Sequence, residues 1–207
     1  CLARAGCALA LGLAAPAQAQ DAASLRSRHD ALRTALASNA FARPLVLESV
    51  ERDDSLRGDI HARIDQPMAV VAAALTGVEH WCDILMLHLN VKQCLAGDAR
   101  AGDALQLAIG QKHDQPLDQT FRFAFAYRVL ASRPDYLQVQ LTADEGPLGT
   151  SGYRIVIELA ALDERRSFLR LSYSYRYGVM ARGAMQAYLA TAGRDKVGFS
   201  VVGRKAD

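Results

Sequence analysis

The chain has 207 residues, of which 51% are hydrophobic and 22% are charged. This length fits one domain with a sizeable core, and the hydrophobic fraction excludes a disordered chain. The formal net charge is only +2, and no cluster of lysines and arginines stands out, so we expect no nucleic-acid partner.

The N-terminal residues have the features of a secretory leader. An apolar run over residues 7–15 follows Arg4, and Ala17-Gln18-Ala19 matches the small-x-small pattern of a signal-peptidase site. The run is too short for a permanent membrane span. We therefore predict a signal peptide over residues 1–19, cleaved after Ala19, and a periplasmic or secreted protein.

Two further expectations concern this leader. Lipoprotein processing at Cys7 is disfavoured, because Arg4 stands where an apolar residue is needed and the apolar run does not precede the cysteine. The chain begins with Cys1 and not with methionine, so we expect the start of the leader to be missing.

Residues 20–55 are predicted to form an N-terminal helix and a linker. Leu25, Leu32 and Leu36 are spaced among polar residues in a way that is typical of an amphipathic helix. This helix either packs on the main body or remains a mobile leader. Pro44 ends it, and a short strand follows.

A strand and two helices are predicted next. Apolar residues alternate with polar ones over 58–65, as in an antiparallel strand with one sheltered face. Asp65-Gln66-Pro67 then opens a helix over 68–75, with the aspartate as its cap and the proline in its first turn. Gly77 breaks this helix, and a second one covers 78–85.

From residue 87 onward the pattern indicates an antiparallel meander, because alternating apolar runs are separated by turn-forming residues. The strands are predicted over 87–91, 105–109, 121–129, 137–141, 153–159 and 169–177. A helix follows over 179–192, and residues 193–202 resemble a further strand. Nothing in the composition indicates a linker to a second domain.

Cleavage of the leader leaves two cysteines, Cys82 and Cys94. In an exported protein such a pair is most simply a disulfide, which would stabilise the fold by about 3 kcal/mol through the closed loop. A metal site built from these cysteines with His80 and His88 is the alternative, but the spacing matches no common zinc motif and we expect no metal. No cofactor is expected.

The strand-to-helix segment resembles an entry found in the START/Bet v 1-like superfamily, also called the SRPBCC or polyketide cyclase-like superfamily. The pattern is carried by Gly58, Ile60, Ala62, Ile64, Asp65 and Pro67, with Trp81 about fourteen residues later. The resemblance covers residues 56–207. It implies an α+β helix-grip fold, in which a curved antiparallel β-sheet is wrapped around a helix and encloses an internal apolar cavity.

Members of this superfamily mostly bind lipids, sterols, polyketides or other apolar ligands, and a minority are cyclases or hydrolases. A secretory leader and a disulfide are unusual for the superfamily. The helix over 179–192 is also short for a gripping helix, which leaves open that the chain ends before its natural C-terminus.

The candidate ligand site is a set of aromatic residues that share one sheet face if the strands pair in register. Its members are Phe121, Phe123, Phe125, Tyr127, Tyr153, Tyr173, Tyr175 and Tyr177. An ordinary core is the competing interpretation. The number of hydroxyl groups favours a pocket, because a buried tyrosine needs a partner for its O–H and a ligand or water can supply one.

The opposite sheet face is predicted to be solvated. By the same alternation, Asp59, His61 and Asp65 point away from the sheltered side, so we do not expect them to act as acid and base in a cavity. The arginines of the later strands also lie on this outer face, where they would attract anionic lipid headgroups. They are Arg122, Arg128, Arg154, Arg170 and Arg176.

The leading hypothesis is an exported, non-enzymatic START-like domain that binds an apolar or lipid-like small molecule. A cyclase or hydrolase that uses His61 or His88 is one alternative. An envelope protein-interaction module is the other. The sequence does not indicate the ligand or the oligomeric state.

Overall fold

The computed structural model describes residues 21–97, 105–191 and 193. The predicted signal peptide and nearly all of the predicted strand over 193–202 lie outside these residues. In the described part, no single helix is long and apolar enough to cross a membrane, although the helices Met68–Thr76 and Val78–Leu85, which are bent by 94°, have sufficient length and apolar character when taken together.

Eight antiparallel strands form one sheet in the order β1-β2-β8-β7-β6-β5-β4-β3. The strands are β1 (Leu45–Glu51), β2 (Ser55–Ile64), β3 (Val91–Ala96), β4 (Leu105–Ile109), β5 (Phe121–Arg133), β6 (Tyr136–Glu145), β7 (Ser151–Ala161) and β8 (Ser167–Arg176). The helices are α1 (Ala22–Ala31), α2 (Arg33–Ala37), α3 (Met68–Thr76), α4 (Val78–Leu85) and α5 (Val179–Ala190). Short 3-10 turns lie at Leu117–Gln119 and Pro147–Gly149.

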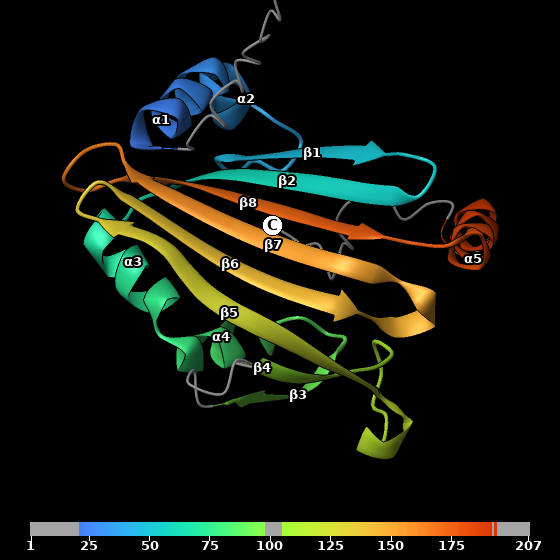
Figure 1. The fold of residues 1–207 in the computed structure, drawn as a ribbon. Coiled ribbons are helices and arrows are strands. Elements are labelled where there is room, and N and C mark those ends of the chain that lie inside the picture. The colour runs from blue at the N-terminus through green and yellow to red at the C-terminus, as the bar shows by residue number, and fades with distance from the viewer. Residues whose placement is uncertain (1–20, 98–104, 192, 194–207) are drawn as a thin grey trace, which may run out of the picture.

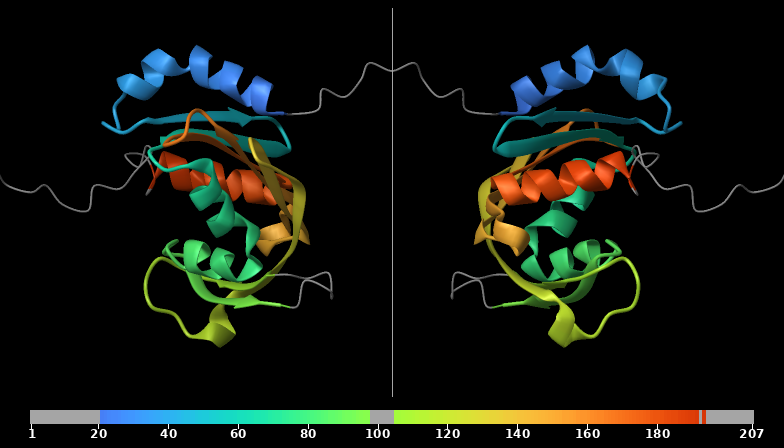
Figure 2. Two further views of the ribbon diagram at one scale, coloured as in Figure 1. Left: turned by 90° about the vertical axis from the view of Figure 1, so that its left-hand side faces the viewer. Right: turned by 90° about the vertical axis from the view of Figure 1, so that its right-hand side faces the viewer.

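The sheet curves so that α3 and α5 lie on its concave side while α1 and α2 lie outside it (Figure 2). Two helices between β2 and β3, and a helix after the last strand, complete the helix-grip arrangement predicted from the sequence. The gripping helix α5 ends at Ala190, and its described side chains are half-buried or exposed.

The main core lies between the concave face and the two inner helices. Leu75 of α3 and Trp81 of α4 pack there against fully buried residues such as Leu105, Val139 and Leu159. The Trp81 indole N–H donates to the Leu75 carbonyl oxygen at 2.9 Å, which satisfies its polar atom and ties α4 to the end of α3.

A second, smaller core lies on the convex face. Leu25 of α1 and Leu36 of α2 pack against Tyr136, Ala160 and Phe168 of the sheet. Of the two alternatives predicted for the N-terminal helix, packing on the main body is therefore the correct one. One detail of the prediction was wrong. The helix breaks at Leu32 into α1 and α2, so the two leucines reach the sheet from separate helices.

Two local predictions were wrong. Pro67 occupies the N-cap position of α3, and Asp65 lies beside Arg63 at 3.4 Å instead of capping the helix. The strand predicted over 87–91 is a turn in which Leu87 is 83% exposed, and β3 begins only at Val91. The chain turns back between α4 and β3, and a covalent link between their side chains holds the two elements together.

That link is the predicted disulfide between Cys82 and Cys94, whose Cα atoms are 5.3 Å apart. Each sulfur atom is bonded to the other, so neither cysteine offers a thiolate to a metal ion. Among the described residues no group of histidine, cysteine and acidic side chains is placed to hold one.

Candidate functional site

The predicted aromatic residues gather on the concave face, and five of them form a contiguous surface that we call the aromatic wall. It consists of Phe123, Phe125, Tyr153, Tyr173 and Tyr175. On adjacent strands, Leu107 pairs with Phe123, Leu105 with Phe125 and Ile155 with Tyr173, so these aromatic side chains lie on the same sheet face as their apolar partners.

One end of the wall is part of the core. Phe123, Phe125 and Tyr153 are each at most 7% exposed, and their ring centroids lie 4.5 to 6.4 Å apart in edge-to-face contacts. The Tyr153 hydroxyl lies 2.6 Å from the Thr150 side-chain oxygen. For these three residues the competing interpretation as ordinary core is therefore adequate.

Three of the predicted residues have other roles. The Tyr127 hydroxyl lies 3.0 Å from the Leu75 carbonyl oxygen and 2.8 Å from that of Thr76, so it caps the end of α3. The Tyr177 hydroxyl donates to the Arg52 carbonyl oxygen at 2.7 Å and fixes the turn between β1 and β2. Phe121 is 51% exposed at the start of β5.

Tyr173 and Tyr175 differ from the other tyrosines. Both are half-buried, and their rings lie 5.5 Å apart. Among the described residues neither hydroxyl has a hydrogen-bond partner. Burial raises the pKa of both phenols, so both keep their protons at neutral pH and can donate to a ligand.

The wall continues into aliphatic rows on the same face. Ile60, Leu171 and Ile157 lie in register across β2, β8 and β7, next to Leu169, and Leu47 on β1 is 37% exposed. An apolar surface that ends in two unpartnered hydroxyl groups can bind an amphipathic molecule and orient its polar end.

The histidines named in the enzyme hypothesis do not line this face. His61 lies on the convex side of β2, where it is 1% exposed, and His88 is exposed in the turn after α4. The concave face therefore has neither of the proposed bases, which removes the histidine-based version of that hypothesis.

The convex face carries a buried ionic cluster that the sequence analysis missed. Asp59 accepts hydrogen bonds from Arg57 at 2.8 and 3.1 Å and from Arg170 at 3.0 and 2.9 Å. Arg170 also donates to Glu158 at 3.2 Å, and Glu158 accepts from the Tyr136 hydroxyl at 2.8 Å. Burial tends to raise the pKa of Asp59, but the two arginines outweigh it and lower this pKa to about 2.

The prediction that Asp59, His61 and Arg170 are solvated was wrong. Alternation correctly placed them on the face opposite the apolar rows, but α1 covers that face and buries His61. The other four arginines, Arg122, Arg128, Arg154 and Arg176, are exposed as predicted. The one feature of the sequence that could have indicated a covered convex face was Phe168, an aromatic residue at an outward position near Arg170.

The surroundings of His61 disfavour its protonated form. The Arg28 side chain donates to its Nε2 atom at 3.5 Å, so the ring proton is on Nδ1, which lies 3.9 Å from a Glu48 carboxylate oxygen. Burial lowers the pKa of His61, and the positive charge of Arg28 lowers it further.

We expect the stability of the protein to decrease as the pH falls below about 6.5, the pKa of histidine in an unfolded chain. The folded state resists protonation of His61 while the unfolded state takes up the proton, so the free energy of unfolding rises with pH through this window. Urea unfolding at pH values between about 5.5 and 7 measures the effect. Substitution His61→Leu should flatten the profile and His80→Gln, at an exposed position, should not; an unchanged slope in His61→Leu would contradict this assignment.

No family model and no curated protein matches the chain. A START superfamily protein from Mycobacterium smegmatis is similar to it at 14% identity and a TM-score of 0.40, over 73% of this chain and 97% of the other. An aromatase/cyclase from Streptomyces sp. R1128 is similar at 12% identity and a TM-score of 0.45, over 72% of this chain and 88% of the other. A truncated norcoclaurine synthase from Thalictrum flavum is similar at 12% identity and a TM-score of 0.44, over 70% of this chain and 91% of the other.

Proposed function

We propose that this protein is an exported START-like domain that binds an apolar or amphipathic, lipid-like small molecule on its concave face without catalysing a reaction. The observation that carries the proposal is the pair of half-buried tyrosines, Tyr173 and Tyr175, whose hydroxyl groups have no hydrogen-bond partner among the described residues and lie next to an apolar surface. Because both side chains are only half-buried, water or the polar end of a ligand can reach these hydroxyl groups and accept hydrogen bonds from them.

The aliphatic rows beside these tyrosines support an apolar ligand body. Ile60, Leu169 and Leu171 are all half-buried although they point to the inner side of the sheet. Contact with a ligand would remove their remaining surface from water, which would contribute roughly 25 cal/mol of favourable binding free energy per Å2 of apolar surface. Affinity would then come from this surface and orientation from the hydroxyl groups.

Export is proposed on two observations. Residues 1–19 have the pattern of a cleavable leader, and the disulfide between Cys82 and Cys94 is typical of an oxidising compartment. The intact mass of protein recovered from the periplasm would show cleavage after Ala19. Two free thiols in that material would contradict the proposal.

The ligand hypothesis predicts that gently purified protein carries a lipid-like molecule, identifiable by mass spectrometry of an organic extract, and binds a fluorescent fatty acid. Substitution Leu171→Arg places a charge among the apolar rows, so we expect it to weaken fatty-acid binding at least about tenfold, which is about 1.4 kcal/mol. The double substitution Tyr173→Phe and Tyr175→Phe keeps the apolar surface and should weaken binding of ligands with a polar head more than that of plain hydrocarbons.

Tyr127→Phe is the matched control. It removes a tyrosine hydroxyl from the same face, but one that is bonded to the end of α3. It should lower stability and leave the affinity for the fatty acid unchanged. Protein without a bound molecule that also fails to bind the fatty acid would overturn the proposal.

A further inference from the structure

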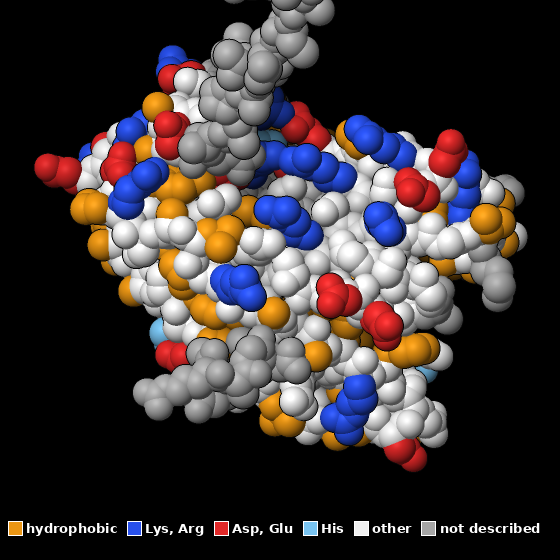
Figure 3. All heavy atoms as spheres, in the orientation of Figure 1, with side chains coloured by type: hydrophobic (Ala, Val, Ile, Leu, Met, Phe, Trp, Pro, Cys, Tyr) orange, Lys and Arg blue, Asp and Glu red, His pale blue; other side chains and the backbone are white. Residues whose placement is uncertain are grey.

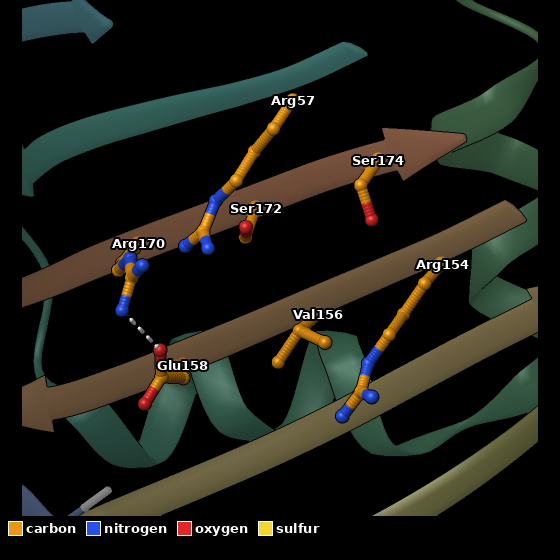
Figure 4. A pocket seen from close by; sticks show the side chains of 7 residues that line it. All are labelled: Arg57, Arg154, Val156, Glu158, Arg170, Ser172 and Ser174. Carbon is orange, nitrogen blue, oxygen red and sulfur yellow. Dashed lines mark hydrogen bonds and ion pairs between the residues drawn. The ribbon is translucent and has the colours of Figure 1, made fainter. Parts of the chain in front are cut away.

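A hollow of about 300 Å3 lies on the convex face, on the opposite side of the sheet from the aromatic wall (Figure 4). Its lining residues are Arg57, Arg154, Val156, Glu158, Arg170, Ser172 and Ser174. A hollow of about 210 Å3 beneath α1 shares Glu158 and Arg170 with it, and one of about 400 Å3 near the β1–β2 turn shares Arg57 and Ser174. The three form a groove along the outer face.

Strand register explains why the surface is hollow here. Arg57 on β2 pairs with Ser174 on β8, which pairs with Arg154 on β7, so two long side chains flank a short one in a single row across the sheet. Adjacent strands are about 4.8 Å apart, which places the two arginine backbones about 10 Å apart. Both arginine side chains extend in the same direction over the sheet, with Val156 between their ends (Figure 4).

The charges around the hollow do not balance. Asp59 holds Arg57 and Arg170 through paired hydrogen bonds, and Glu158 accepts from Arg170 and Tyr136. Arg154 is exposed and has no hydrogen-bond or ion-pair partner among the described residues. The three arginines of the hollow therefore exceed Asp59 and Glu158 by one positive charge.

Asp59 and Glu158 also fix the positions of the arginine side chains around the hollow. Asp59 uses the Nε and Nη2 groups of Arg57, which fixes that guanidinium and leaves its Nη1 group available. Figure 3 shows blue arginine and lysine side chains over this face of the molecule, interspersed with red acidic ones.

We propose that this hollow binds a phosphate group, either free or as part of a phosphate ester or lipid headgroup. The guanidinium groups of Arg57 and Arg154 lie on either side of Val156, and Ser172 lies near the guanidinium of Arg57, so two cationic groups border the same hollow. A phosphate group has enough oxygen atoms to accept hydrogen bonds from both guanidinium groups at once. Arginine forks bind phosphate oxygens through charge-assisted hydrogen bonds.

Isothermal titration of the full chain with inorganic phosphate, at constant ionic strength set with chloride, tests the proposal. We expect the wild type to bind phosphate at millimolar concentrations or below, and Arg154→Gln to weaken binding about tenfold or more. Arg154 has no structural partner, so this variant should fold normally, which circular dichroism checks. Arg122→Gln is the matched control, because Arg122 lies on the same sheet but bonds to Gln93 away from the hollow.

Absence of phosphate binding by the wild type would overturn the proposal, as would an equal loss in Arg122→Gln and Arg154→Gln. Flotation with phosphatidylglycerol and phosphatidylcholine vesicles separates the two sources. If Arg154→Gln reduces binding to the vesicles, the group is a lipid headgroup. If inorganic phosphate binds and neither vesicle does, the ligand is a free phosphate or a soluble phosphate ester.

Discussion

The substitution Arg170→Met is expected to lower the free energy of unfolding by about 3–5 kcal/mol, the usual cost of breaking a buried ion pair from one side. The side chains of Asp59 and Glu158 are only 14% and 3% exposed, and Arg170 itself is 19% exposed. Without the arginine, two carboxylates that face the same gap would be left in low-dielectric surroundings and would repel each other. Urea unfolding at neutral pH measures the change.

Arg57→Met is the matched control for this prediction. Arg57 bonds to the same Asp59, but its side chain is 50% exposed, so we expect a loss of about 1 kcal/mol or less. Adding Glu158→Gln to Arg170→Met should restore part of the stability because one buried charge is removed. Equal losses in the two arginine variants would contradict the role assigned to Arg170.

The faces of the strands could be predicted from the sequence because alternation in a strand has a strict period of two. Alternation alone predicts Tyr153, Tyr173 and Tyr175 on one face and Arg154 and Arg170 on the other, and the register confirms both. The pairing of Cys82 with Cys94 was also predictable, because these are the only two cysteines in the sequence after the predicted signal peptide.

What covers each face could not be predicted, because alternation is a local property and coverage depends on segments distant in the chain. His61 is buried by α1, which precedes it by about thirty residues, so its outward position implied solvent only until the helix was placed. Likewise, no local pattern distinguishes Tyr153, whose hydroxyl has a partner, from Tyr173, whose hydroxyl has none in the part of the chain that the structure describes.

The two proposed sites follow from the same two faces. On the concave side, Tyr173 and Tyr175 are half-buried beside the apolar rows. On the convex side, α1 and α2 cover the row at Phe168 but not the row at Ser174, where the arginines lie open. The sheet itself therefore supplies the binding residues of both proposed sites.

The attachment of α1 to the convex face should depend most strongly on Phe168, which is fully buried. Its ring lies 5.1 Å from that of His29 on α1 and 6.1 Å from that of His61 on β2, so it fills the space between helix and sheet. We expect Phe168→Ala to lower the free energy of unfolding by about 3–5 kcal/mol, because it removes a large apolar side chain and leaves a cavity. Limited trypsin digestion should then cut at Arg26 or Arg28 sooner than in the wild type, since α1 is held less firmly.

Phe121→Ala provides the comparison within the same chain. Phe121 is 51% exposed, so its truncation should change the free energy of unfolding by only about 0.5 kcal/mol and leave the trypsin pattern of α1 unchanged. If Phe168→Ala lost stability while α1 stayed as protected as in the wild type, the helix would be held by its ionic contacts instead. Arg26 to Asp135 at 3.4 Å and Arg28 to Glu48 are the candidates, but both pairs are about half exposed and contribute about 1 kcal/mol each at most. The buried ring, and not the ion pairs at the rim, should therefore decide whether α1 stays on the sheet.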